Sequence, residues 1–191
     1  TYAVPGFAEI ARQRVDPPPR WVFGTEGGVF LHTHQEDLCR IERWQVNSPA
    51  EVVANLPLHG DINFDYMGRW VAYVLGDEGS DVYLKSLVDP TIPVRHLHTH
   101  NEPISSIVLH PELEWIAVGD EPSSTITLWA LDGETGGPIK TLDASSPYNF
   151  STDRSGKRII GNDQVDGLPI VSVWDLGLPD GAAPLVLISR V

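Results

Sequence analysis

Acidic side chains recur along this chain in a pattern that could bind a positively charged partner. They stand in four turns, at 36–37, 77–81, 120–121 and 163–166. Equivalent turns of a repeat protein emerge on one face, so their carboxylates would form an arc of negative potential that attracts a basic protein. The alternative is that Asp favours turns because its side chain hydrogen-bonds the nearby backbone. The candidate partner-binding residues are Glu36, Asp37, Asp77, Glu78, Asp81, Asp120, Glu121, Asp163 and Asp166.

Histidine side chains separated by two positions are the second candidates for chemistry. On a strand this spacing directs side chains to one face, where imidazoles can bind a metal ion such as zinc. His32 and His34 form one such pair, and His96, His98 and His100 form a longer group. His32, His34, His96 and His98 are therefore candidate metal ligands, and a structural or solvent-exposed role is the alternative. We expect no resident cofactor.

Motifs of the common catalytic classes are absent from the sequence. It has no Gly-x-Ser-x-Gly elbow, no phosphate-binding glycine loop, no His-Glu-x-x-His and no EF-hand spacing. Cys39 is the single cysteine, so no intrachain disulfide can form, and nothing around it resembles a nucleophile site. We expect a non-catalytic protein in a reducing compartment such as the cytoplasm. Because the chain begins at Thr1, a periplasmic or secreted location is the alternative.

Charge narrows the classes of partner. The 191 residues include 26 acidic and 13 basic side chains, which gives a formal net charge of −13. Phosphate backbones and anionic lipids would repel such a chain, so nucleic-acid binding and membrane-surface functions are not expected. Hydrophobic residues make up 41% of the sequence, which is enough to bury a core. A protein partner, most simply a basic one, fits this balance.

Four repeats must position these side chains. Two independent sets of anchor residues are spaced by 49, 45 and 43 residues and by 41, 44 and 45 residues. A period of about 40 to 45 residues indicates a propeller or a solenoid. The anchors are Trp21, Trp70, Trp115 and Arg158 in the first set, and Trp44, Lys85, Trp129 and Trp174 in the second.

Each repeat contains four short apolar runs separated by Gly, Pro, Asp, Asn and Ser, which is typical of strands joined by tight turns. Four-stranded antiparallel units at this period are the blades of a β-propeller. We therefore predict an all-β chain of four blades with four antiparallel strands each. The predicted segments are an N-terminal tail at 1–7, blade 1 at 8–57, blade 2 at 58–102, blade 3 at 103–146 and blade 4 at 147–191.

The first repeat differs from the others in the length of one turn. Its two anchors, Trp21 and Trp44, are 23 residues apart, whereas the later pairs are 15, 14 and 16 apart. About eight extra residues are therefore expected between Thr25 and Leu38, after strands at 10–15 and 21–24. A loop longer than its repeats require is often functional, although loops also accept insertions at little cost.

These residues resemble one known family. The run from His100 to Ile104, the turn Leu109-His110-Pro111 and the pair Trp174-Asp175 are similar to the repeats of tryptophan-aspartate (WD) propellers. The resemblance covers residues from about 8 to 191. It implies a fold of about seven blades, so the four blades here would be part of a larger propeller. A missing segment, another chain or a second copy would complete it. A closed four-bladed ring of about this length is the alternative.

The same resemblance implies structural roles for His100, Trp129, Trp174 and Asp175. In the family, a buried network links the Trp to a loop His and to an Asp about six residues before the Trp. Because none of the four expected positions holds an Asp, this network should be incomplete in every blade, and the blades should depend on apolar packing between sheets. The residues at the expected Asp positions are Leu38, Gly79, Ser123 and Leu168.

The function implied is a non-catalytic scaffold or sensor module for protein interactions, including signalling, within a larger WD-repeat protein. One alternative is a propeller that accompanies an enzyme, such as a peptidase gate or a periplasmic ligand-binding propeller. The other is a metal-binding propeller that uses the clustered histidines.

Overall fold

A computed structural model describes residues 21–35, 38–45, 48–57, 60–75, 80–120, 122–132, 137–145, 147–165, 168–179 and 181–187. These residues form sixteen β-strands and no helix. A helix long and apolar enough to cross a membrane is therefore not found among them. The chain divides into two compact units, 1–58 and 59–191.

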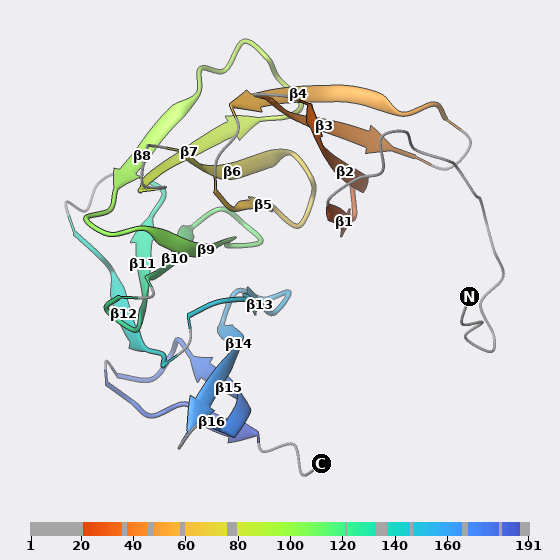
Figure 1. The fold of residues 1–191 in the computed structure, drawn as a ribbon. Coiled ribbons are helices and arrows are strands. Elements are labelled where there is room, and N and C mark those ends of the chain that lie inside the picture. Colours follow the sequence, from red (N-terminus) through yellow and green to blue (C-terminus); the bar gives the residue numbers. More distant parts are fainter. Residues whose placement is uncertain are drawn as a thin grey trace, which may run out of the picture. The chain divides into compact units, whose positions relative to one another are not determined.

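Unit 1 holds one antiparallel sheet, blade 1, whose strands follow chain order from β1 to β4 (Figure 1). Alternate side chains of β3 and β4 enter its core, where Ile41 and Leu56 are at most 2% exposed. This alternation is the expected pattern of a sheet strand. The strands are β1 (Trp21–Thr25), β2 (Gly28–Gln35), β3 (Leu38–Trp44) and β4 (Glu51–Pro57).

The expected long loop between Thr25 and Leu38 is instead strand β2. In the register, Val29 pairs with Trp44 just as Ile116 pairs with Trp129 in a later repeat. Gly28, rather than Trp21, is therefore the residue equivalent to Trp70, and blade 1 has no insertion. Trp21 begins the first strand, and the strand expected at 10–15 lies outside the described residues.

Unit 2 holds three further sheets, which we call blades 2, 3 and 4, and each is an antiparallel meander of four strands. All four sheets together confirm the predicted all-β organisation. The strands of blade 2 are β5 (Ile62–Phe64), β6 (Trp70–Leu75), β7 (Asp81–Ser86) and β8 (Arg95–Thr99). Those of blade 3 are β9 (Ile104–Leu109), β10 (Trp115–Asp120), β11 (Thr125–Ala130) and β12 (Lys140–Asp143). Those of blade 4 are β13 (Phe150–Thr152), β14 (Arg158–Val165), β15 (Leu168–Asp175) and β16 (Leu185–Leu187).

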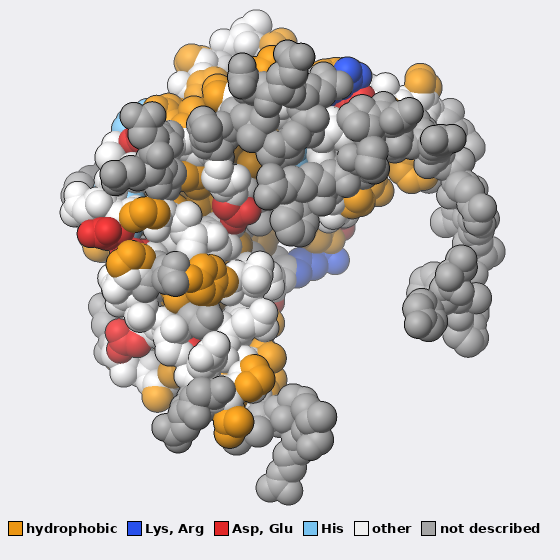
Figure 2. Space-filling view, viewed as in Figure 1, with side chains coloured by type: hydrophobic (Ala, Val, Ile, Leu, Met, Phe, Trp, Pro, Cys, Tyr) orange, Lys and Arg blue, Asp and Glu red, His pale blue; other side chains and the backbone are white. Residues whose placement is uncertain are grey.

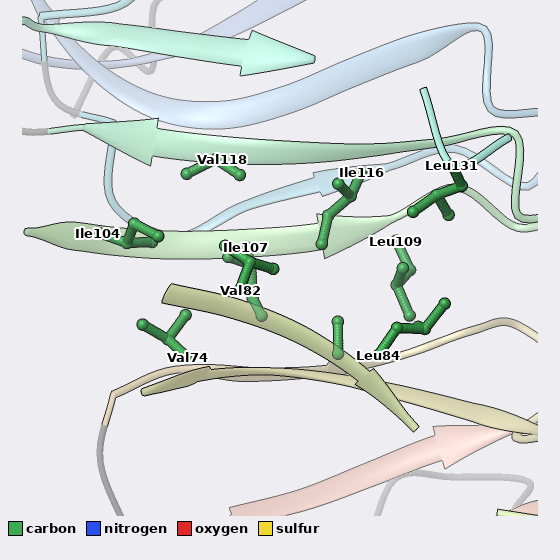
Figure 3. Close-up of a cluster of buried hydrophobic side chains, with 10 residues drawn as sticks. Val74, Val82, Leu84, Ile104, Ile107, Leu109, Ile116, Val118 and Leu131 are labelled. Atoms are coloured by element: carbon green, nitrogen blue, oxygen red, sulfur yellow. The ribbon is translucent and has the colours of Figure 1, made fainter. Parts of the chain in front are cut away.

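Within unit 2, consecutive blades pack face to face, and we call each packed pair of faces a joint. The first strands β5, β9 and β13 lie side by side along the joints (Figure 1). The joint of blades 2 and 3 is a cluster of aliphatic side chains that includes Val74 and Leu84 from one sheet and Ile107 and Ile116 from the other (Figure 3). The joint of blades 3 and 4 contains Leu128, Phe150, Ile159 and Trp174, among others.

One cation crosses each of these joints at the same place in the repeat. The Arg95 guanidinium donates a hydrogen bond to the carbonyl oxygen of Leu131 at 2.7 Å, and Lys140 Nζ donates to the carbonyl of Leu176 at 3.1 Å. Both pairs are 36 residues apart. These bonds satisfy backbone oxygens at the end of a blade that the sheet itself leaves unpaired.

The turn between the first and second strands also repeats in blades 2 to 4. Gly68 and Gly156 take the left-handed conformation there, each with φ of 66°, and Leu113 takes it with φ of 60°. Gly156 additionally lies directly against the ring of His110 from the preceding blade, and a Cβ added to Gly156 would be 1.7 Å from His110 Nε2. This glycine is therefore required by its backbone angle and by its neighbour.

We predict that Gly156→Ala destabilises the protein by at least about 2 kcal/mol, because it combines left-handed strain with a clash against a buried ring. Urea denaturation would measure the change. Gly137→Ala is the matched control, since a Cβ at Gly137 meets no atom within 4 Å and its φ is not positive. Equal stability of the two variants would contradict this account of the joint between blades 3 and 4.

Candidate functional site

Three of the nine candidate acidic residues lie in the described part of the chain, and one of them is at the surface. Asp81, whose side chain is 29% exposed, accepts hydrogen bonds from Thr99 Oγ1 at 2.6 Å and from His96 Nε2 at 3.2 Å. The other two are Asp120 and Asp163. Those outside the described residues are Glu36, Asp37, Asp77, Glu78, Glu121 and Asp166.

Asp120 and Asp163 are buried, with 3% and 8% of their surface exposed. They are strand residues rather than turn residues, and Asp163 pairs with Ile170 across a hairpin that continues for two more pairs. Both carboxylates point into the protein, where they accept hydrogen bonds. They therefore do not contribute to an exposed arc of negative charge, and their expected role as contacts for a partner is corrected to a structural one.

Asp163 is the centre of a buried polar network in blade 4. Its Oδ1 accepts hydrogen bonds from the backbone N–H and the hydroxyl of Ser145, and its Oδ2 accepts one from Ser172 Oγ at 2.8 Å. Burial alone would raise the pKa of Asp163, but these hydrogen bonds outweigh it and lower the pKa below its usual value. The carboxylate thus ties the loop before blade 4 to the two central strands of that blade.

This network was not expected from the sequence, because the expectation placed the Asp six residues before the Trp. Asp163 stands eleven residues before Trp174, since the hairpin of β14 and β15 is longer than the family spacing implies. Ser145 supplies the donor that a loop His would supply. Trp174 Nε1 donates to the backbone carbonyl of Asp143 at 3.1 Å rather than joining the carboxylate.

Blade 3 has a looser version of the same arrangement. His100 Nδ1 is 3.9 Å from Asp120 Oδ2, too far for a hydrogen bond, and Asp120 Oδ1 accepts one from the N–H of Ser123 at 3.3 Å. Among the described residues, neither His100 Nδ1 nor Trp129 Nε1 has a hydrogen-bond partner, although both atoms are buried. The His98 ring stacks on Trp129, at 3.8 Å between ring centres.

The histidines of β8 do not share a face. The register of β7 and β8 shifts after the pair Tyr83 and His96, so that His98 pairs with Val82 and one extra residue is inserted between the two histidines. Such a bulge reverses the alternation of side chains. His96 consequently packs on Tyr83 at 5.0 Å between ring centres, while His98 faces blade 3.

The histidines of blade 1 give no metal site either within the described part of the structure. His32 is 4% exposed, and the side chain of His34 lies outside the description. No group of three side chains able to hold a metal ion occurs among the described residues. Cys39 is buried in the same sheet, and burial raises the pKa of its thiol to about 12. The thiol is therefore protonated and is not a nucleophile at neutral pH.

The remaining structural candidate, Asp175, lies at the exposed end of β15. Its Oδ1 accepts a hydrogen bond from the N–H of Gly177 at 3.0 Å, and its Oδ2 is 3.8 Å from Arg158 Nε. These contacts fix the turn that leaves the third strand of blade 4.

A groove of about 500 Å³ opens at one end of the joint between blades 2 and 3. Its floor is apolar, and Trp70 and Leu113 are its partly exposed walls. Acidic and basic side chains stand at its edge. The complete lining is Trp70, Leu84, Arg95, Leu113, Glu114, Leu131 and Asp132.

Solved structures with a similar fold are β-propellers. Hsv2 from Kluyveromyces lactis superposes with a TM-score of 0.63 at 12% identity, over 90% of this chain and 52% of that chain. A chain of a nidogen/laminin complex gives 0.61 at 16% identity, over 82% and 60%. TolB from Acinetobacter baumannii gives 0.60 at 12% identity, over 83% and 39%. No protein-family profile and no curated protein sequence matches the chain.

These likenesses establish the β-propeller fold. The chain spans about half the length of the Hsv2 structures that it matches. Its four blades of four strands therefore fit part of a larger propeller.

We predict that Asp163→Ala destabilises the protein by about 1–3 kcal/mol, because it leaves buried donors of Ser145 and Ser172 without an acceptor. Chemical denaturation would measure the loss. Glu102→Ala, at an exposed turn position, is the control and should change stability by less than about 0.5 kcal/mol. A cost for Asp163→Ala no larger than that of the control would argue against the network.

Stability should fall as the pH is lowered through the titration range of histidine. Burial, aided by the charges of His100 and His96, lowers the pKa of His98 below its usual value of 6.5, and burial also lowers the pKa of His110. The unfolded chain then binds these protons more readily, so stability is complete above about pH 6.5 and is lost progressively below it.

Urea denaturation at a series of pH values would measure this slope. His98→Gln should make it shallower, whereas His96→Gln, on the other face of β8, serves as the matched comparison. An unchanged slope in His98→Gln would contradict the assignment of the pH dependence to the lowered pKa of His98.

Proposed function

We propose that this chain is a non-catalytic protein-interaction module, a scaffold or sensor region of a larger propeller protein with degenerate WD-type repeats. The observation that carries the larger-propeller part of this proposal is the outward face of blade 4, the face turned away from blade 3, and the groove between blades 2 and 3 is the candidate surface for a partner. Aliphatic side chains are exposed at the centre of the outward face and on its last strand, flanked by the exposed polar residues Arg158, Asn162 and Asp175, whereas the equivalent faces of blades 2 and 3 are buried in joints. Contiguous apolar surface on a folded protein marks a place where another protein surface packs.

The equivalence rests on the strand register. Ala72 pairs with Leu84 across blade 2, and both are buried in the joint with blade 3. Ala117 pairs with Leu128 in the same way, and both are buried in the joint with blade 4. The exposed fractions of these four side chains are between 0% and 2%.

Ile160 and Val173 form the corresponding pair in blade 4. Ile160 is 37% exposed and Val173 is half-buried. The last strand extends the patch, because Leu185 pairs with Val173 and is 65% exposed, and Leu187 is 51% exposed. Figure 2 shows hydrophobic side chains at the surface over this sheet. Ile160, Val173, Leu185 and Leu187 therefore form an exposed aliphatic patch on a face whose margins are polar.

The occupant that fits this face is a further four-stranded blade. At both joints of unit 2 the face is covered by the first and second strands of the next sheet, through Ile107 and Ile116 at one and Phe150 and Ile159 at the other. Ile160 is larger than the alanines at its equivalent positions, so the occupant must present a small side chain opposite it.

The test is to add a blade. A second copy of residues 147–187, with Ile160→Ala in the original blade, is appended to the chain. We expect a higher unfolding temperature and reduced binding of the dye ANS, because the added sheet covers the apolar face. The control is the same fusion with Ile159→Lys in the added copy, which places a charge in the new joint.

Equal dye binding by the fusion and its control would contradict docking of a blade. A second measurement uses the chain without an added blade. The double variant Leu185→Ser/Leu187→Ser should bind less ANS than the unmodified chain. If the unmodified chain instead forms a dimer that Val173→Lys dissociates, the occupant of the face is a second copy of the chain and not a further blade.

A further inference from the structure

The groove between blades 2 and 3 departs from the repeat at one residue. Gly68 and Gly156 occupy the left-handed position of their turns, but blade 3 has Leu113 there with φ of 60°. A left-handed conformation costs a residue with a side chain about 1–2 kcal/mol. Such strained positions are concentrated at ligand clamps and active sites. Leu113 packs against the apolar cluster of the joint and also lines the groove.

The equivalent position at the next joint is closed. Gly156 lies against the His110 ring, and Trp115, which is equivalent to Trp70, is only 6% exposed. Trp70 remains partly exposed beside Leu113. The floor between them comes from Leu84 and Leu131, which lie at the same end of the apolar cluster (Figure 3). The groove therefore presents the partly exposed side chains of Trp70 and Leu113 to a ligand, above a floor of buried leucine side chains.

The charged side chains at the edge of the groove indicate which class of ligand could bind there. The Glu114 side chain is 69% exposed, and Asp132 is exposed at the other margin. The basic side chain of the lining, Arg95, already donates to the carbonyl of Leu131 at 2.7 Å. The protein as a whole carries a formal charge of −13, which adds to the attraction for cations.

We infer that this groove binds a basic peptide segment that inserts one large aliphatic or aromatic side chain between Trp70 and Leu113. The inserted side chain gains from burial against the apolar floor, and its lysine or arginine neighbours meet Glu114 and Asp132. A volume of about 500 Å³ lies within the usual range of roughly 300–1,000 Å³ for ligand sites. This inference rests on the proposed interaction function and names one partner surface for it.

The test uses a lysine-rich nonapeptide with one central leucine. The protein is labelled with ¹⁵N at its six tryptophans, and Trp70→Phe identifies the indole signal of Trp70. We expect the peptide to shift that signal and to bind at least tenfold more tightly than the same peptide with serine in place of leucine. A peptide with glutamate in place of lysine should not bind.

Matched variants locate the site. Leu113→Gly relieves the strain and removes the wall, so it should abolish the preference for leucine over serine. Glu114→Gln combined with Asp132→Asn should weaken binding of the leucine peptide several-fold, whereas Glu112→Gln, an exposed acid of the same turn, should not.

Three results would overturn the inference. These are no shift of the Trp70 signal at millimolar peptide, equal binding of the leucine and serine peptides, or leucine preference that survives in Leu113→Gly. Binding of N-acetyl-leucine amide as strong as that of the peptide would assign the groove to small apolar molecules instead. The added-blade experiment tests the outward face of blade 4, which is separate from the groove, so a chain that docks a blade but fails the peptide test overturns only the inference about the groove.

Discussion

Apolar packing between consecutive sheets is the interaction on which the described structure of unit 2 depends. A four-stranded sheet has two faces and cannot bury either by itself, so its neighbours supply the cover. Side chains such as Leu84, Ile116 and Leu128 are at most 2% exposed in the joints, and complete burial of each contributes about 1.5–3 kcal/mol. The turns, the polar networks and the groove are all held in place by these contacts.

Apolar packing has little directional preference, so hydrogen bonds fix how the sheets are aligned. Asp61, directly before β5, and Asn63, on β5, accept hydrogen bonds from the N–H groups of Ile107 and Leu109 on β9, at 3.0 and 3.1 Å. Arg95 performs a comparable task at the far end of the joint. Polar atoms at both ends therefore bracket the apolar cluster and prevent one sheet from sliding along the other.

The repeat and its four strands can be predicted from the sequence, because apolar runs and turn residues alternate at a constant period. The strand register is harder to predict from the sequence. Trp21 looks like the anchor of the first repeat, whereas Gly28 is the true equivalent, and the short Glu-Gly turn before it is the signal that reveals this. No feature of the amino-acid composition indicates the bulge between His96 and His98. Asp163 was missed because a fixed offset from the tryptophan ignores the length of the hairpin.

The contact of Gly156 with His110 bears on how such a chain can change over evolutionary time. The glycine belongs to one repeat and the ring that requires it belongs to the repeat before. Exchange of a single repeat by recombination would part the two and place an unsuited residue against the imidazole. A segment whose exchange leaves this pair in place therefore starts just after His110 and ends just before Gly156, so its limits lie in the first turns of two consecutive blades and not at the blade boundaries.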